Sequence, residues 1–166
     1  YKNVSCERIK YYNGDIFDID FEKKFDVVVN LAVIEHVWDV QQFIKKIARL
    51  CRTGGLIMTM TVNDQSLIYR ASRLANKIGI KTAHQRLYDK HHLNHFSKKS
   101  LRWLLESEGL ITVDHYCHVP RIKAIDMPPT NNNLSKYANI AGLVSLIGAE
   151  KITKETIYQT ITSKLN

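Results

Sequence analysis

The stretch from residue 25 to residue 62 constrains the fold most, because it alternates between the patterns of strand and helix. Residues 25–31 (FDVVVNL) have an unbroken apolar centre, which is typical of a strand covered on both faces. Residues 56–62 (LIMTMTV) repeat that pattern, and a helical segment separates the two. A chain that crosses from strand to strand through a helix builds a parallel sheet, so we predict the α/β class.

The connecting segment, residues 40–52, predicts an amphipathic helix. Asp39 is placed to cap it, with Gln42 three residues on, as in a capping box. Gly54-Gly55 is expected to end the helix. Apolar residues recur at helical spacing and share one face: Val40, Phe43, Ile44, Ile47, Ala48 and Cys51.

Further patterns extend this α/β interpretation along the chain. Strands are predicted over residues 9–13, 110–119 and 156–164, and helices over residues 65–78, 98–108 and 134–147. Residues 126–133 (DMPPTNNN) predict an exposed loop. Ser97 is expected to cap the helix at 98–108, with Leu101, Leu104 and Leu105 facing inward. The helix at 65–78 carries an apolar stripe of Leu67, Ile68, Ala71, Leu74, Ala75 and Ile78.

Composition excludes several classes of protein. The chain has 166 residues, is 45% apolar and 24% charged, and carries a net charge of +8, which is ordinary for a globular domain and unlike a disordered or collagenous chain. No apolar run approaches the ~20 residues of a membrane helix, and residues 1–10 lack a signal pattern, so we expect a cytosolic domain. Cys6, Cys51 and Cys117 have no metal-binding spacing and are expected to be buried free thiols.

The positive charge does not by itself indicate a nucleic-acid partner. Lys45-Lys46, Arg49 and Lys98-Lys99 are dispersed along helical segments and are not interleaved with aromatic residues. A solvated helix face explains such a pattern. We therefore expect a partner other than nucleic acid.

Polar residues follow each predicted strand of the parallel part. Asp15 follows residues 9–13, Asn30 and Glu35 follow residues 25–29, and Asn63-Asp64 follows residues 56–62. Ligands of open parallel sheets bind beyond the carboxyl ends of the strands. These residues are therefore expected at one edge of the sheet.

The order of these motifs resembles that of class I S-adenosylmethionine-dependent methyltransferases of the small-molecule type, similar to the ubiquinone-biosynthesis O-methyltransferases. The resemblance rests on Phe25-Asp26, Glu35-His36, the amphipathic helix, Gly54-Gly55, the next apolar strand and Asn63. The later string HHLNHFSKKSLRWLLESEGL resembles the family's His-x-x-Phe-Ser segment and following helix. Over about residues 8–119, the resemblance implies a Rossmann-like sheet with flanking helices.

One part of the family pattern is missing. The family's glycine-rich turn after the first strand, and the acidic residue ending the second, have no counterpart here. The chain is then a fragment, a longer chain that is only partly represented, or a degenerate domain that lost its cofactor. The family's first strand would lie beside residues 25–31, and without it that strand has an open apolar edge. We therefore favour the C-terminal two thirds of a single methyltransferase-like domain.

The resemblance also implies a set of residues for S-adenosylmethionine. Asp15 would accept a hydrogen bond from the adenine amino group, and Ile16 would pack on the ring. The alternative is that Gly14-Asp15 is only a turn. The backbone around the methionine part of the cofactor would come from Asn30, Leu31 and Ala32.

Glu35 and His36 are the candidate catalytic pair. Methyl transfer from a sulfonium is an in-line displacement, so the enzyme aligns the reactants and removes a proton from a hydroxyl acceptor. Histidine can take that proton near neutral pH. The alternative is that the pair positions the start of the next helix. A metal held by Glu35, His36 and Asp39 lacks a defined geometry, and we predict no metal.

Residues 88–96 (YDKHHLNHF) resemble the family's lid over the acceptor pocket. His91 and His95 are predicted to contact the acceptor together with Asn63, within a helical insertion over residues 65–96. A metal pair of His91 and His95 would need a helix and further ligands. Phe96 and Trp103 are expected in the core.

The resemblance thus implies methyl transfer from S-adenosylmethionine to a small-molecule acceptor, preferentially at oxygen. Two alternatives stay open, an inactive methyltransferase-like interaction module and an RNA methyltransferase. The sequence leaves the oligomeric state undetermined.

Overall fold

The structure, a computed structural model, describes residues 9–88, 90–118 and 158–165. Its framework is a mixed sheet with the strand order β1-β2-β4-β3. The first two strands are parallel, and β4 runs antiparallel to both β2 and β3. The bounds are Phe25–Leu31 for β1, Cys51–Val62 for β2, Leu110–His118 for β3 and Tyr158–Leu165 for β4. The predicted helix at 134–147 and loop at 126–133 lie outside the described residues.

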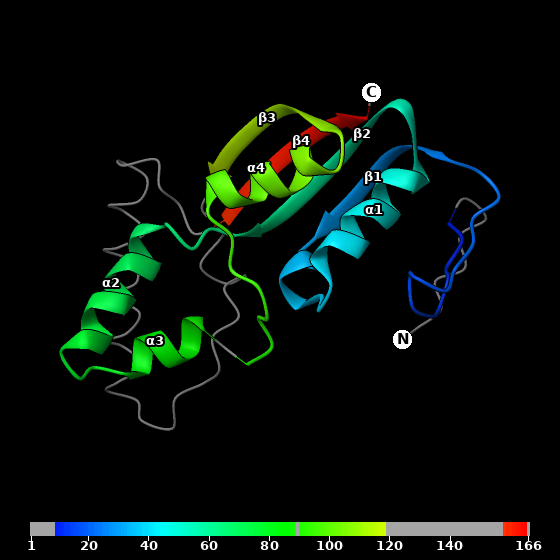
Figure 1. Cartoon of the computed structure of the whole chain (residues 1–166). Helices are drawn as coiled ribbons and strands as arrows, with labels where there is room; N and C mark the ends of the chain where they lie inside the picture. The colour runs from blue at the N-terminus through cyan, green and yellow to red at the C-terminus, as the bar shows by residue number, and fades with distance from the viewer. Residues whose placement is uncertain (1–8, 89, 119–157, 166) are drawn as a thin grey trace.

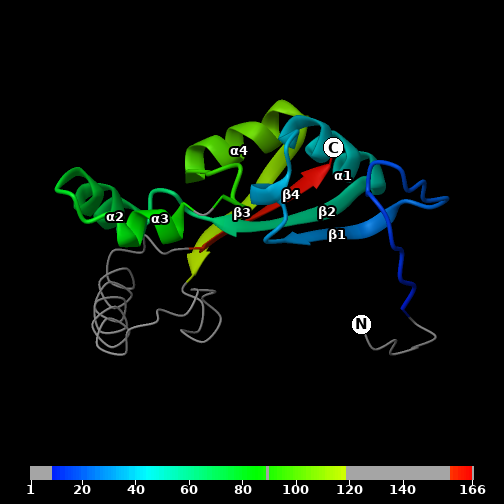
Figure 2. The ribbon, with the colours of Figure 1, turned by 90° about the horizontal axis from the view of Figure 1, so that it is seen from below.

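Two helices cover one face of this sheet. Helices α1 (Val40–Leu50) and α4 (Lys98–Ser107) lie side by side on that face, as the edge-on view in Figure 2 shows. Helices α2 (Leu67–Lys77) and α3 (Thr82–Leu87) extend beyond the end of β2 (Figure 1). The short 3-10 helix η1 (Ile34–His36) connects β1 to α1. No helix among the described residues is long and apolar enough to cross a membrane.

Helix α1 begins where its sequence predicts. The Asp39 carboxylate accepts a hydrogen bond from the backbone N–H of Gln42 at 2.9 Å, which satisfies one of the free amides of the first turn. The helix ends at Leu50, two residues earlier than predicted, because Cys51 already pairs with Phe25 in the sheet.

Gly54 and Gly55 lie inside β2 and do not end the helix, which corrects the prediction. The register between β1 and β2 is irregular here, since Phe25 pairs with Cys51 but Val27 pairs with Leu56. A Cβ atom on Gly55 would lie 2.6 Å from the Cys51 Sγ and 2.8 Å from the Asp26 carbonyl oxygen. The irregularity therefore requires glycine at position 55.

The main core lies between the sheet and the two covering helices. On α1 and α4 the positions predicted to face inward are buried, except Val40, which is half-buried, and Phe96 is buried at 7% exposed. Trp103 is 66% exposed, so its predicted place in the core is wrong. Helix α4 turns its leucines toward the sheet, and Trp103 lies on the opposite side of the helix. The buried cluster includes Phe43, Ile44, Ile47, Ile57, Leu101, Leu104, Leu105, Leu110 and Ile161.

Two further sequence predictions need correction. Residues 9–13 form no strand, and Tyr11 is 72% exposed, because a strand needs a hydrogen-bonded neighbour and β1 pairs only with β2 among the described residues. The helix predicted over residues 65–78 begins two residues later and ends one residue earlier, as α2, because Ser66 caps its first turn. It buries Ile68, whereas Leu74 of the predicted apolar stripe is 65% exposed.

The face of the sheet opposite α1 and α4 is apolar and open at β1. Val27, Val29 and Leu31 are 53%, 51% and 52% exposed. Their partners on β2 are Leu56, Met58 and Met60, which lie on the same face. Within the described sheet β1 is an edge strand, in agreement with the open apolar edge expected from the sequence.

The described cysteines are free thiols. Cys51 is buried and Cys117 is half-buried, which agrees with the predicted free thiols at these positions, while Cys6 lies outside the described residues. Burial raises the pKa of the Cys51 thiol, so this sulfur is a poor nucleophile near neutral pH.

Candidate functional site

The carboxyl ends of β1 and β2 lie at the same edge of the sheet because the two strands are parallel. At this edge the Asn30 side chain is buried, at 6% exposed, and its Nδ2 donates to the Thr59 Oγ1 at 2.9 Å. Its Oδ1 atom is buried and has no hydrogen-bond partner among the described residues. The carboxyl end of β1 therefore keeps one unsatisfied acceptor.

The backbone reverses direction directly after β1. Ala32 has φ of 53°, in the left-handed region that non-glycine residues rarely adopt. Its N–H donates to the Met60 carbonyl oxygen at 3.0 Å, which anchors the strained residue to β2. Such strain of about 1–3 kcal/mol collects at ligand-binding turns. Leu31 and Ala32 are both exposed at this turn.

Glu35 is buried behind this turn. Its side chain is 1% exposed, and its Oε2 accepts a hydrogen bond from the Thr61 hydroxyl of β2 at 2.8 Å. Its backbone carbonyl oxygen accepts from the N–H groups of Leu93 and Asn94 at 2.8 and 3.1 Å. Glu35 therefore joins three segments: the turn after β1, the end of β2, and residues 91–96.

His36, the next residue, is exposed. Its Nδ1 lies 2.7 Å from the His91 carbonyl oxygen. A carbonyl oxygen can only accept, so Nδ1 carries the proton and the neutral ring keeps its lone pair on Nε2. The two members of the predicted catalytic pair thus differ in exposure: Glu35 is buried and His36 is exposed.

A row of aromatic rings runs from His36 into the helical segment. His36 packs on His92 with ring centroids 4.9 Å apart, and His92 lies 6.0 Å from His95. His95 in turn lies 4.6 Å from Tyr88, which stacks on His84 at 4.4 Å. The row continues from the turn after β1 to α3.

Two nitrogens in this row are buried without a partner. His92 Nδ1 and His95 Nε2 have no hydrogen bond to any residue that the structure describes. Burial lowers the pKa of His95, and the nearby Asp64 carboxylate only partly offsets this. Buried polar atoms normally find partners, and these two nitrogens find none among the described residues.

Glu35, His36 and His92 also place ligand-type atoms within 4.8 Å of one another. This set differs from the one considered from the sequence, since Asp39 caps α1. Three such ligands are the number that a catalytic zinc site uses, one fewer than a closed structural site, and here the His36 Nδ1 is already engaged with the His91 carbonyl oxygen. His91 and His95 are not on a helix, so the helical metal pair is wrong. We assign no metal to this cluster.

Asn63 ends β2 in a fully buried position. Its Oδ1 accepts from the Gln65 N–H at 3.1 Å, and its backbone forms a parallel bridge with Phe96. This arrangement brings the segment after His95 against the end of β2. Of the residues predicted to contact an acceptor, His95 has the atom that is buried without a partner, while His91 is exposed.

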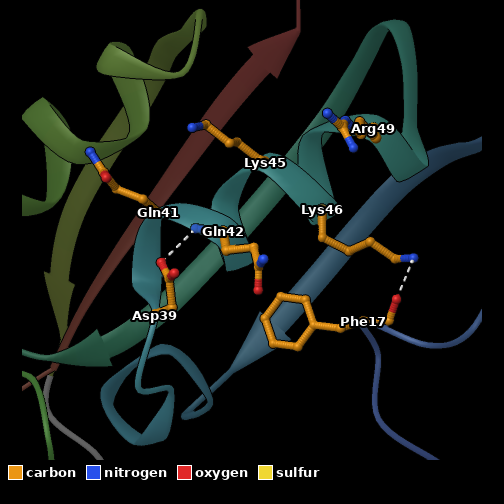
Figure 3. A pocket seen from close by; sticks show the side chains of 7 residues that line it. All are labelled: Phe17, Asp39, Gln41, Gln42, Lys45, Lys46 and Arg49. Carbon is orange, nitrogen blue, oxygen red and sulfur yellow. Dashed lines mark hydrogen bonds between the residues drawn. The ribbon is translucent and has the colours of Figure 1, made fainter.

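Asp15 lies in a turn and not at the end of a strand. Its Oδ1 accepts from the Phe17 N–H at 3.0 Å, and its backbone carbonyl accepts from Asp18. Lys46 Nζ donates to the carbonyl oxygens of Phe17 and Ile19, so this segment is tied to α1 (Figure 3). The structure therefore shows the turn that was the alternative interpretation of Gly14-Asp15. Ile16 packs against the main core.

A separate hollow of about 450 Å³ lies beside that contact, on the outer side of α1 (Figure 3). It contains none of the predicted catalytic or binding residues. Its lining is polar and largely cationic: Phe17, Asp39, Gln41, Gln42, Lys45, Lys46 and Arg49.

Comparisons with known proteins place the chain in a family. A family model described as a methyltransferase domain matches residues 3–115. Ubiquinone biosynthesis O-methyltransferase of Rickettsia conorii is 37% identical over 69 residues, which are 42% of this chain and 24% of that protein. An S-adenosylmethionine-dependent methyltransferase structure from Thermotoga maritima has a TM-score of 0.53 at 14% identity and covers 92% of this chain and 62% of its own. The [4+2]-cyclase SpnF has a TM-score of 0.57 at 12% identity, covering 96% and 57%.

Fold and sequence together define the class, that of the class I S-adenosylmethionine-dependent methyltransferases, enzymes with a Rossmann-like sheet whose cofactor is S-adenosylmethionine. The chain belongs to the methyltransferase-domain family, whose model matches more than half of it. The family recognised from the sequence is thereby confirmed. The match to the Rickettsia relative spans about a quarter of that protein's length, 24%.

The described residues fit one part of S-adenosylmethionine. The exposed, left-handed turn at Leu31 and Ala32, next to the unsatisfied Asn30 Oδ1, offers polar backbone and side-chain atoms of the kind that bind an amino acid. The residues proposed for the adenine of the cofactor fit less well, because one carboxylate oxygen of Asp15 already accepts a hydrogen bond within its own turn. The fit is therefore better at the methionine end.

The sequence did not predict a role for four side chains that lie at this site: Asp64, Arg73, Tyr88 and His92. The string YDKHHLNHF did contain a signal, since His92 and His95 are three residues apart. The contacts among Asp64, Arg73 and Tyr88 are long-range and have no local sequence pattern.

Proposed function

We propose that this chain is part of an enzyme that transfers the methyl group of S-adenosylmethionine to a hydroxyl oxygen of a small molecule. The observation that carries the proposal is the hydrogen bond between His36 Nδ1 and the His91 carbonyl oxygen, at 2.7 Å. It fixes the ring with Nε2 as the proton acceptor at the carboxyl edge of a methyltransferase sheet. The match to a ubiquinone biosynthesis O-methyltransferase supports oxygen as the acceptor atom.

In this proposal His36 removes the hydroxyl proton. Bound S-adenosylmethionine supplies an electrophilic methyl group on sulfur. The hydroxyl oxygen of the acceptor is a weak nucleophile until its proton leaves, and Nε2 of His36 takes that proton. Glu35 acts by holding the turn and residues 91–96 together through Thr61, Leu93 and Asn94.

The acceptor would lie under the helical insertion at residues 65–96. His95 Nε2 is one of two side-chain nitrogens in this insertion that are buried without a partner among the described residues, the other being His92 Nδ1, and we assign His95 Nε2 a hydrogen bond to the acceptor. His91 contributes through its backbone carbonyl, and Asn63 through the bridge that brings Phe96 to β2.

The cofactor would contact Asn30, Leu31 and Ala32 at the carboxyl end of β1. Backbone groups freed by the left-handed turn would bind its amino-acid part. Asp15 and Ile16 remain the proposed contacts for adenine, and they would need to reach the edge of the sheet from their turn beside α1.

The domain itself is proposed to be larger than the described sheet. Val27, Val29 and Leu31 form an exposed apolar row on an edge strand, which is unfavourable in water. The methyltransferase structure from Thermotoga maritima is longer than the region it shares with this chain, which covers 62% of it. We propose that further polypeptide of the same domain covers this face.

Calorimetric titration of the full-length protein with S-adenosylhomocysteine tests the proposal. Saturable binding is expected in the wild type. The affinity should fall when Ala32 is replaced by proline, because proline cannot adopt the positive φ of this turn. A Gln41→Ala variant on the outer side of α1 is the control and should bind normally. Absence of binding to both S-adenosylhomocysteine and S-adenosylmethionine would leave an inactive interaction module as the better interpretation.

An RNA acceptor predicts a different result in the same protein. Binding to a short structured RNA would weaken steeply as salt increases, because Lys and Arg would displace counterions from phosphates. A small-molecule enzyme should show no such binding at physiological salt.

A further inference from the structure

A compact polar cluster lies where the helical insertion meets the end of β2. Tyr88 Oη donates to the Asp64 Oδ1 at 2.6 Å, and Arg73 Nη1 donates to the same oxygen at 2.8 Å. Arg73 Nη1 also donates to the Tyr88 Oη at 2.6 Å and to the Asp64 carbonyl oxygen at 3.0 Å. Each of the three side chains therefore contacts both of the others.

The cluster joins three segments that are far apart in sequence. Asp64 lies two residues after the end of β2, Arg73 lies on α2, and Tyr88 follows α3. The Asp64 N–H donates to the Phe96 carbonyl oxygen at 3.0 Å, so the cluster is also tied to the chain next to His95. The Tyr88 hydroxyl is thus fixed relative to the sheet edge.

Fixing that hydroxyl fixes the Tyr88 ring. The ring is held between His84, at 4.4 Å and 18° between planes, and His95, at 4.6 Å and 34°. The Tyr69 ring packs edge-on against the Tyr88 ring, with centroids 5.3 Å apart and 84° between the ring planes. The Tyr69 hydroxyl donates to the Leu87 carbonyl oxygen at 3.2 Å, so this neighbour is anchored as well.

The His95 imidazole is held by these rings and by a hydrogen bond to the backbone of Leu87, the residue before Tyr88. Its Nε2 atom is buried and has no hydrogen-bond partner among the residues that the structure describes. Its ring contacts are with Tyr88, Tyr69 and His92.

We infer that Tyr88, held by Asp64 and Arg73, is a positioning residue that aims the His95 imidazole at the acceptor. The inference rests on the proposed function, because His95 is there assigned to the acceptor. If Tyr88 only packed its ring against His95, phenylalanine at this position would do the same. The hydroxyl adds two hydrogen bonds that relate the ring to the carboxyl end of β2, where the reaction takes place.

Proton NMR of the full-length protein tests the positioning without an acceptor. The Cε1–H signal of His95, assigned with a His95→Gln variant, is followed through a pH titration in wild type, Tyr88→Phe and Tyr88→Leu. In Tyr88→Leu the titration midpoint should rise toward that of a solvated histidine, because the covering ring is lost. Tyr88→Phe should give a smaller rise and a changed chemical shift. Identical His95 titrations in wild type and Tyr88→Leu would overturn the inference.

Kinetics with catechol as the probe acceptor then test the consequence. Tyr88→Phe should lower kcat/KM for catechol by about tenfold to a hundredfold, which is the effect of a misplacement of about 1 Å, and leave KM for S-adenosylmethionine within about twofold. Tyr11→Phe, at a position 72% exposed, is the matched control and should behave as wild type. An unchanged kcat/KM in Tyr88→Phe and Tyr88→Leu, with His95→Gln inactive, would also overturn it.

The two failures are distinguishable. If the protein does not bind S-adenosylhomocysteine, the proposed function fails and the inferred role toward an acceptor fails with it. If the protein binds the cofactor and methylates catechol, but the His95 titration is the same with and without Tyr88, only the positioning role is overturned.

Discussion

His36 Nδ1 lies 2.7 Å from the carbonyl oxygen of His91, a residue far along the chain. This contact decides the tautomer of the imidazole, because the backbone oxygen accepts and cannot donate. It also links the turn after β1 to residues 91–96, next to the two hydrogen bonds that the Glu35 carbonyl oxygen accepts. The proposed base and the attachment of residues 91–96 to the turn after β1 therefore depend on the same contacts.

Replacing His36 with glutamine should remove the base and keep much of the junction. The glutamine amide can still donate to the His91 carbonyl oxygen but cannot take a proton. We expect kcat for catechol methylation to fall by about 10²–10⁴-fold, the usual contribution of a general base. Calorimetry should show unchanged binding of S-adenosylhomocysteine. Unchanged turnover in this variant would show that His36 is only structural.

Replacing Gly55 with alanine should destabilise the fold. The added Cβ would lie 2.6 Å from the Cys51 Sγ and 2.8 Å from the Asp26 carbonyl oxygen, so β2 must shift away from β1. Overpacking of this kind costs about 1–3 kcal/mol of unfolding free energy, which chemical denaturation measures. Thr53→Ala, at an exposed position of the same strand, is the control. Equal stability of both variants would contradict the described register.

Stability should decrease as the pH falls below 6.5, the ordinary pKa of histidine. Burial lowers the pKa values of His95, His115 and His118 in the folded chain. Between these lowered values and 6.5 the unfolded chain binds more protons, so unfolding becomes easier as the pH falls and the stabilisation is complete above 6.5. Urea midpoints at pH values above and below 6.5 measure this effect.

A His118→Asn variant is the matched test of that pH dependence. Asparagine does not titrate, and because it also removes the contact between His118 Nε2 and the Thr160 hydroxyl, which is 3.1 Å long, the change of stability with pH is compared and not its absolute value. The variant should lose less stability than wild type over the same pH interval. An identical loss would mean that His118 does not contribute.

Lysine at Val27 and Val29 tests whether the open sheet face is covered in the full-length protein. Both side chains are about half exposed in the described residues, where lysine would be tolerated. If further polypeptide covers this face, each lysine becomes a buried unpaired charge and lowers the free energy of unfolding by about 3 kcal/mol or more. Gln41→Lys, on the exposed side of α1, should be neutral. Tolerance of both lysines, measured by thermal unfolding, would contradict a covered face.

Local patterns were sufficient to predict the elements that bury an amphipathic face. The spacing of apolar residues located α1, and the Asp39 cap fixed its first residue. Ser97 did the same for α4, where its side chain and that of Ser100 satisfy each other's backbone. The alternation over residues 156–164 predicted a strand, and β4 lies there at Tyr158–Leu165.

Features that depend on distant partners were not predictable in this way. Residues 9–13 have strand character, but no described strand lies beside them to pair with. Gly54-Gly55 has the sequence of a helix end, yet the pairing of Cys51 with Phe25 draws these glycines into β2.

The candidate site was likewise predictable only in part. Glu35 and His36 could be found as a motif, but the sequence could not show that Thr61 and His91 determine their separate orientations. Tyr88 had no motif at all, because its partners Asp64 and Arg73 come from other segments.

The most direct test of the central claim is the fate of an isotopically labelled methyl group. The full-length protein is incubated with labelled S-adenosylmethionine and either catechol or its nitrogen counterpart, o-phenylenediamine. The products are separated and identified by mass spectrometry. The account predicts a labelled methyl ether of catechol, formed by wild type and strongly reduced in His36→Gln. A label found only on nitrogen, or equal ether formation by both proteins, would contradict it.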